Sequence, residues 1–247
     1  SGIMEDGLTS ATEEGTPQGS ILSPLLSNIY LHYVLDLWFS RRVRRHCRGE
    51  SEYFRFADDF LACFQYKDDA EAFLQRLRDR IEGFGLKLAE DKTQCIEFGR
   101  FAREKMQQRG EKPQDFTFLG LTHYCGKTKE GYFKVKRRTS RKKLGQSLHK
   151  FTEWTIKAHH VQRKGDMIRS ARTRVVGYLN YYAITDNADR CNYYVHCVTE
   201  ILFKWLNRKS QRKAYTWDQF KQALAWANWP TVSICKDLNP CRRAEAH

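Results

Sequence analysis

Two neighbouring carboxylates, Asp58 and Asp59, stand between two apolar runs in the stretch YFRFADDFLACF. Apolar residues alternate on both sides of the pair, so residues 54–64 are predicted to form a strand, a tight turn and a second strand. Two carboxylates at a hairpin tip repel each other unless they take up protons or bind a cation. A solvated turn is the alternative, because Asp also favours turns by accepting bonds from its own backbone. The pair alone does not choose between these two.

The composition favours a nucleic-acid partner. The chain has 247 residues, of which 41% are hydrophobic, enough for one large or two smaller packed domains. Its net charge of +14 predicts a polyanionic partner, nucleic acid before an anionic membrane surface. Without a long apolar run or a signal-peptide pattern, we expect a cytoplasmic protein with no membrane insertion, an organelle being the alternative. The eight cysteines contain no C-x-x-C pair, which disfavours a zinc ribbon or a disulfide framework.

Two helices are predicted around the hairpin. Apolar residues recur at helical spacing over residues 22–37 and again over residues 73–84. Asp68 and Glu71 have the spacing of a capping box at the start of the second helix. The basic residues 41–48 are predicted to be an exposed connection between the first helix and the hairpin.

Further strands are predicted downstream. Residues 86–99 are expected to form a turn and a strand, and residues 116–138 a pair of strands around a turn rich in Gly and Lys. This mixed order predicts an α+β fold, in which an antiparallel sheet carries the carboxylates and helices pack behind it.

Positive charge is concentrated after the last predicted strand. From about residue 134 helical patterns take over, and we place a domain boundary there. Residues 134–175 contain 14 Lys or Arg against Glu153 and Asp166, so the local net charge is 14 − 2 = +12. Aromatic residues follow in GYLNYY and CNYYVHC, and basic helices with nearby aromatics are typical of proteins that bind a phosphate backbone. A merely solvated basic face is the alternative.

Five segments in order, GTPQGSILSPLLSNIYL, FRFADDF, GLKLAEDKT, FTFLGL and RTRVVGYLNYYAITDNADRCNYYVHC, resemble successive motifs of group II intron-encoded reverse transcriptases and maturases. The resemblance covers nearly the whole chain. It implies a polymerase palm portion over residues 1–133, a basic, mainly α-helical thumb or maturase domain over residues 134–230, and a C-terminal tail over residues 231–247.

The resemblance also implies RNA-directed DNA polymerase activity with a maturase role in intron splicing and mobility. Nucleotide addition is a phosphoryl transfer that uses two Mg²⁺ ions, and Asp58 and Asp59 match the carboxylates that hold them. The family's third aspartate lies upstream of the first motif, and the chain is expected to begin after it and to be inactive alone. The implied partners are group II intron RNA, an RNA template with a DNA primer, and deoxynucleotides; a homo-oligomer stays open.

Several further residues match family roles. Pro17, Gln18, Gly19 and Ser20 match the nucleotide pocket, although Gln18 could instead cap the helix. Lys92 matches a lysine near the incoming nucleotide, with an exposed surface lysine as the alternative. The primer-positioning element corresponds to Phe118, Leu119 and Gly120, which would equally suit a plain hairpin. The implied RNA-binding residues are Arg137, Arg138, Arg141, Lys142, Lys143, Arg169, Arg172, Arg174, Asn180, Tyr181 and Tyr182.

The chain departs from the family pattern at two positions, and two alternative functions are also consistent with the sequence. Phe56 stands where tyrosine is more usual, and Tyr178 where the maturase motif usually has tryptophan. The C-terminal residues lack the paired C-x-x-C motifs of a His-Asn-His endonuclease, so no DNA-cleaving domain is predicted. The alternatives are a non-catalytic maturase that acts only as a splicing factor, and a reverse transcriptase of the retron or diversity-generating type.

Overall fold

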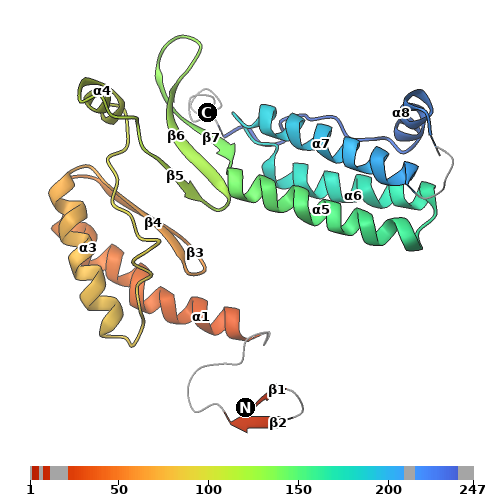
Figure 1. The fold of residues 1–247 in the computed structure, drawn as a ribbon. Helices are drawn as coiled ribbons and strands as arrows, with labels where there is room; N and C mark the ends of the chain where they lie inside the picture. Colours follow the sequence, from red (N-terminus) through yellow and green to blue (C-terminus); the bar gives the residue numbers. More distant parts are fainter. Residues whose placement is uncertain (1, 6–7, 12–21, 209–214, 239–247) are drawn as a thin grey trace, which may run out of the picture. The chain divides into compact units, whose positions relative to one another are not determined.

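The computed structural model describes the chain except residues 1, 6–7, 12–21, 209–214 and 239–247 (Figure 1). The chain forms two compact units, Ser1–Glu97 and Phe98–His247, and each is described by itself. In the described residues, antiparallel sheets of two or three strands combine with packed helices, which confirms the predicted α+β class. None of the described helices has the length and apolar character needed to cross a membrane.

The first unit contains a long helical segment, the carboxylate hairpin and a second helix. Two of its helical stretches, η1 and η2, are π-helical, a geometry often found at functional sites. The elements in chain order are β1 (Gly2–Glu5), β2 (Leu8–Ala11), α1 (Ser23–Leu31), η1 (His32–Asp36), η2 (Phe39–Val43), α2 (Arg44–His46), β3 (Ser51–Phe56), β4 (Asp59–Phe64) and α3 (Lys67–Glu82).

The core of this unit lies between η1, η2 and α3, with the hairpin packed beside it. Phe39 stacks on Tyr53 of β3 with ring centroids 5.0 Å apart, and it meets Phe73 of α3 edge to face. Burial of these rings holds the hairpin against the helices. By contrast, α1 has no buried residue, and its apolar side chains other than the partly buried Leu31 are exposed. The buried core residues are Val34, Leu35, Phe39, Val43, Phe73, Leu77 and Ile81.

Two predictions in the first unit need correction. The basic side chains of residues 41–48 are exposed as predicted, but the segment is not simply a connection, because helix continues to His46 and Val43 is only 3% exposed in the core. The apolar spacing from Phe39 to Val43 explains this, since it keeps one side of the basic helix on the core. Residues 86–99 form no strand: the N–H groups of Lys92 and Thr93 turn back to the carbonyl of Ala89.

The predicted capping box at the second helix is also absent. α3 begins after Tyr66, and no side chain caps it. Asp68 instead forms an ion pair with Arg48, and Glu71 pairs with Lys67. The acidic first turn of the helix is therefore stabilised by cations rather than by a reciprocal cap.

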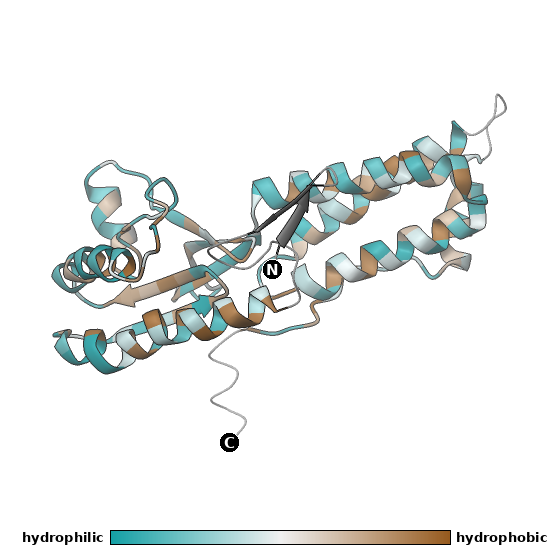
Figure 2. Ribbon diagram, turned by 90° about the horizontal axis from the view of Figure 1, so that it is seen from below, coloured by the Kyte–Doolittle hydropathy of each residue, from teal (hydrophilic) through white to brown (hydrophobic). Residues whose placement is uncertain are grey.

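The second unit joins a three-stranded sheet to a helical bundle. The strands β5 (Asp115–Phe118), β6 (Leu121–Lys127) and β7 (Phe133–Thr139) are antiparallel in the order β5-β6-β7, which confirms the strand pairs predicted for residues 116–138. Along the long helices apolar residues alternate with polar ones, the pattern of an amphipathic bundle (Figure 2). The helices are α4 (Ala102–Gln108), α5 (Arg141–Val161), α6 (Lys164–Tyr182), α7 (Ala188–Asn207) and α8 (Trp217–Trp226).

The sheet and the bundle of the second unit are tied together by buried hydrogen bonds. Thr139, the last residue of β7, donates its N–H to Oδ1 of Asn187 at 2.7 Å, and Nδ2 of Asn187 donates back to Oγ1 of Thr139 at 2.8 Å. Ser140 then caps α5 by accepting a bond from the N–H of Lys143. Along the chain, the division between the two compact units falls between Glu97 and Phe98, upstream of the compositional boundary at residue 134.

Candidate functional site

The two carboxylates lie at the end of a tight antiparallel hairpin. β3 and β4 pair in a register that sets Phe56 opposite Asp59, so the connecting turn consists of Ala57 and Asp58. Ala57 has φ of 54°, a positive value at the first turn residue, as a type II′ hairpin turn requires. The structure therefore confirms the predicted strand, turn and strand.

Asp58 and Asp59 are available to a ligand. Both residues are exposed, and among the described residues neither carboxylate has a hydrogen-bond or ion-pair partner. No cluster of three or more His, Cys, Asp or Glu that could hold a metal ion occurs in the described part of the chain. Adjacent carboxylates without partners offer the hard oxygen ligands that Mg²⁺ prefers, so the pair fits part of a magnesium site.

The hairpin is fixed to the core by its aromatic side chains. Tyr53 contacts Phe39 on one side and Phe60 on the other, with ring centroids 5.0 and 5.6 Å apart. Burial raises the pKa of the Tyr53 phenol well above its usual range, so this side chain stays neutral. Phe56, which stands where the family more often has tyrosine, is 65% exposed near the tip.

The predicted nucleotide-binding residues are only partly described. Pro17, Gln18, Gly19 and Ser20 lie outside the described residues. Lys92 is exposed in the loop that follows α3. That loop is held by Glu90, whose two carboxylate oxygens accept bonds from Arg78 of α3 at 3.0 and 3.1 Å.

Of the predicted primer-positioning residues, Phe118 ends β5, and Leu119 and Gly120 form the turn between β5 and β6. Two of the predicted RNA-binding tyrosines lie against this turn. Leu119 and Gly120 both have positive φ, 51° and 78°, as a type I′ turn requires. The Tyr181 hydroxyl donates to the carbonyl of Leu119 at 2.9 Å. A Cβ added at Gly120 would lie 2.9 Å from the hydroxyl of Tyr182. The structure thus brings together two groups of residues that are about 60 positions apart in sequence.

Gly120→Ala is expected to destabilise the second unit more than Gly131→Ala does. Both glycines have positive φ, which costs an alanine about 1 kcal/mol, but an added Cβ at Gly131 meets nothing within 4 Å. The contact with Tyr182 should raise the cost at Gly120 by a further 1–3 kcal/mol or so. Urea unfolding of the two variants measures the difference, and equal losses would show that the tyrosines do not restrain this turn.

The predicted RNA-binding cations fall into two groups. Arg137 is only 15% exposed in its side chain and lies beside Asp186, which also accepts a 2.8 Å bond from Lys134. Arg138 pairs with Asp115, and Arg172 donates to the carbonyl of Asn228. The exposed group, where α5 begins and along α6, comprises Arg141, Lys142, Lys143, Arg169 and Arg174, with Asn180 nearby on α6. Of these, Arg169 also forms an exposed ion pair with Asp166 at 2.7 Å.

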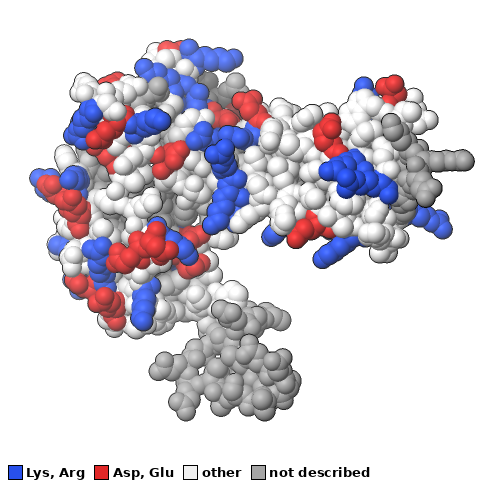
Figure 3. Space-filling view, viewed as in Figure 1, with Lys and Arg blue, Asp and Glu red and all other residues white. Residues whose placement is uncertain are grey.

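Basic side chains gather where the three-stranded sheet meets the helices, whereas Lys and Arg are mixed with Asp and Glu over the first unit (Figure 3). This distribution gives the second unit a basic patch beside the sheet that suits a polyanion.

A polar contact between Arg55 and Asp36 lies beneath the hairpin and was not predicted from the sequence. Each residue is a single charge inside an apolar run, YFRF for Arg55 and YVLDLWF for Asp36. Charges in such positions are rarely buried unless they are paired, so opposite charges in two apolar runs were a signal that could have identified the pair.

Residues 4–123 match the family model described as reverse transcriptase (RNA-dependent DNA polymerase). The match includes the carboxylate hairpin, Lys92 and the turn between β5 and β6. The chain is also 34% identical to protein YkfC of Escherichia coli (strain K12) over an alignment of 119 residues, which covers 37% of this chain. The aligned part spans about a third of that relative, 31% of its length.

Proposed function

We propose that this chain is part of an RNA-directed DNA polymerase in which Asp58 and Asp59 are catalytic metal ligands. The observation that carries the proposal is the pair of exposed carboxylates without partners on a two-residue turn, within residues that match the reverse transcriptase model. A solvated turn would not require the surrounding residues to match a reverse transcriptase. The interpretation of Asp58 and Asp59 as a solvated turn is therefore the weaker of the two.

The chain's own residues have distinct roles in this proposal. Asp58 and Asp59 would hold two Mg²⁺ ions, which supply charge stabilisation for the attacking and leaving oxygens of phosphoryl transfer. Lys92 would neutralise charge on the departing pyrophosphate, and Pro17, Gln18, Gly19 and Ser20 would line the nucleotide pocket. The turn at Phe118, Leu119 and Gly120 would position the primer end, with its backbone held by Tyr181. Holding the reacting groups in this geometry before the reaction lowers the activation barrier, because less entropy is lost on reaching the transition state.

We further propose that the second unit binds intron RNA and the template–primer duplex and so acts as a maturase. Its exposed cations at the start of α5 and on α6 support this, as does the motif resemblance over residues 172–197. The experiment that separates the combined function from a splicing-only maturase is RNA-templated primer extension by the full-length protein. A retron or diversity-generating enzyme would extend the primer but would not promote splicing of a group II intron.

RNA affinity should depend steeply on salt. Each phosphate contact is expected to lower log K by roughly 0.9 per log unit of salt on a duplex-like ligand. If Arg141, Lys142 and Lys143 each contact a phosphate, replacing all three by Gln should reduce the slope by about 3. Filter binding of structured RNA at a series of salt concentrations measures the slope.

The matched control replaces two exposed lysines of the same unit by Gln: Lys127 at the end of β6 and Lys129 in the β6–β7 turn. An unchanged slope in the triple variant, or an equal decrease in the control, would remove the start of α5 from the RNA-binding surface.

A further inference from the structure

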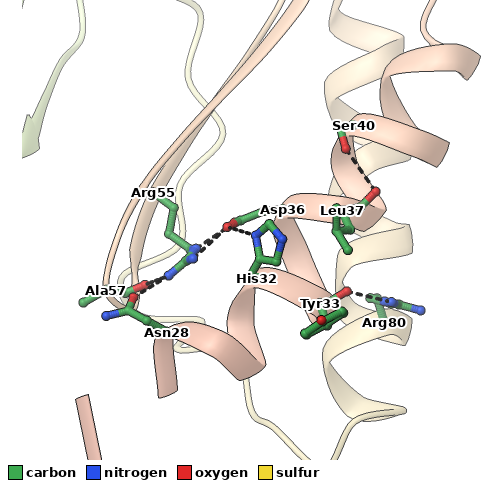
Figure 4. A network of polar contacts seen from close by, with 9 residues as sticks. All are labelled: Asn28, His32, Tyr33, Asp36, Leu37, Ser40, Arg55, Ala57 and Arg80. Atoms are coloured by element: carbon green, nitrogen blue, oxygen red, sulfur yellow. Dashed lines mark hydrogen bonds and ion pairs between the residues drawn. The ribbon is translucent and has the colours of Figure 1, made fainter. Parts of the chain in front are cut away.

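Arg55 reaches from the carboxylate hairpin to three partners (Figure 4). Its Nε and Nη2 atoms donate to the two carboxylate oxygens of Asp36, each at 2.7 Å. Its Nη1 atom donates to Oδ1 of Asn28 at 2.9 Å and to the backbone carbonyl of Ala57 at 2.8 Å. Since Asp36 belongs to η1 and Asn28 to α1, one guanidinium ties the hairpin turn to two parts of the helical segment.

The bond to Ala57 acts at the strained point of the turn. Ala57 has φ of 54°, a conformation that glycine adopts readily and alanine does not. Its carbonyl belongs to the peptide group that leads directly into Asp58. A donor fixed on this carbonyl therefore sets the orientation of the peptide from which both catalytic carboxylates follow.

The charge of Arg55 is satisfied away from the catalytic carboxylates. Its side chain is 11% exposed and that of Asp36 is 28% exposed, so the two form a partly buried bidentate pair. The hydrogen bonds from Arg55 lower the pKa of Asp36 below its ordinary value, because they stabilise its charged form. Because Asp36 neutralises the guanidinium, Arg55 supports the turn without competing with a cation for Asp58 and Asp59.

We propose that Arg55, anchored by Asp36 and Asn28, is a positioning residue that locks the Ala57–Asp58 peptide and thereby presents the two carboxylates together. The inference rests on the polymerase function proposed above. It adds to that function a structural device in which Arg55, within the segment FRFADDF, is anchored by two helical residues outside that segment, Asp36 and Asn28.

The test substitutes Arg55→Lys in the full-length protein. Lysine keeps the charge but cannot bond Asp36 at two atoms and Ala57 at a third. The backbone amide of Asp59, the residue that closes the turn opposite Phe56, should then exchange with solvent at least about 10-fold faster, because local opening of the turn costs less. Primer extension should lose about 10- to 10²-fold in kcat, with the KM for deoxynucleotide nearly unchanged and more Mg²⁺ needed for half-maximal rate.

The matched control is Arg44→Lys. Arg44 of α2 pairs at 2.7 Å with Glu52, which lies in β3, the strand that also holds Arg55. Both side chains are 56% exposed, and neither reaches the turn. This variant should leave amide exchange at Asp59 and all kinetic constants unchanged. Asp36→Asn is the second test variant, so that the outcome does not depend on one substitution folding well.

Adding Ala57→Gly to Arg55→Lys should restore part of the lost kcat and lower the Mg²⁺ requirement, because glycine adopts positive φ without a restraint. Wild-type amide exchange in both Arg55→Lys and Asp36→Asn would overturn the positioning role, whatever the activity. If the wild-type protein extends no primer, the polymerase proposal fails, and the exchange rates still decide whether Arg55 holds the turn.

Discussion

Asp58→Asn and Asp59→Asn are each expected to reduce Mg²⁺-dependent primer extension by at least about 10²-fold. Asparagine matches aspartate in shape, so the two-residue turn and the pairing of Phe56 with Asp59 should remain. What changes is the charge, because a neutral amide oxygen is a much weaker ligand for Mg²⁺ than a carboxylate. The loss should appear mainly in kcat, since it removes charge stabilisation of the transition state.

The control for these variants is Asp79→Asn, which removes an exposed acid from α3 in the same unit. It should leave the rate unchanged. Circular dichroism and RNA affinity of all three variants should equal those of the wild type, because the exposed carboxylates make no described contact to the fold. Wild-type extension rates in Asp58→Asn would show that this carboxylate does not serve as a metal ligand.

Asn187→Ala is expected to lower the free energy of unfolding of the second unit by roughly 2–4 kcal/mol. Asn187 is fully buried, and its amide bonds the N–H and hydroxyl of Thr139 and the carbonyl of Tyr182 within 2.8 Å. Alanine leaves these buried groups without that partner and opens a small cavity between β7 and the bundle. The same change should loosen the Tyr181 and Tyr182 segment against the turn at Gly120.

Urea unfolding followed by circular dichroism measures this loss. Asn192→Ala is the matched control, because Asn192 is exposed on the same helix α7 and should change stability by less than about 0.5 kcal/mol. Equal stabilities of the Asn187→Ala and Asn192→Ala variants would contradict a structural role for the buried amide.

The carboxylate hairpin could be predicted because its signal is local. Apolar residues alternate on both sides of a two-residue turn, and the pairing that results needs no distant partner. The expected strand at residues 86–99 was wrong because strand formation depends on a partner edge, and the backbone there turns back on Ala89 while Glu90 bonds Arg78. The sequence pattern could not reveal either contact.

The hydrogen bonds that hold the carboxylate hairpin and the β5–β6 turn in place were harder to predict, because they join residues far apart in sequence. Arg55 and Asp36 are 19 residues apart, and Tyr181 and Leu119 are 62 apart. Composition also could not separate exposed cations from paired ones. Arg137 lies beside Asp186 with a largely buried side chain, whereas the neighbouring Arg141 is exposed, and both are basic residues in one stretch.

The most direct test of the proposed function is Mg²⁺-dependent extension of a DNA primer on an RNA template by the full-length protein, with the product sequenced. We expect complementary DNA that requires the RNA template, Mg²⁺ and all four deoxynucleotides. Absence of any template-dependent product from a folded protein that still binds intron RNA tightly would contradict the polymerase and leave a non-catalytic maturase.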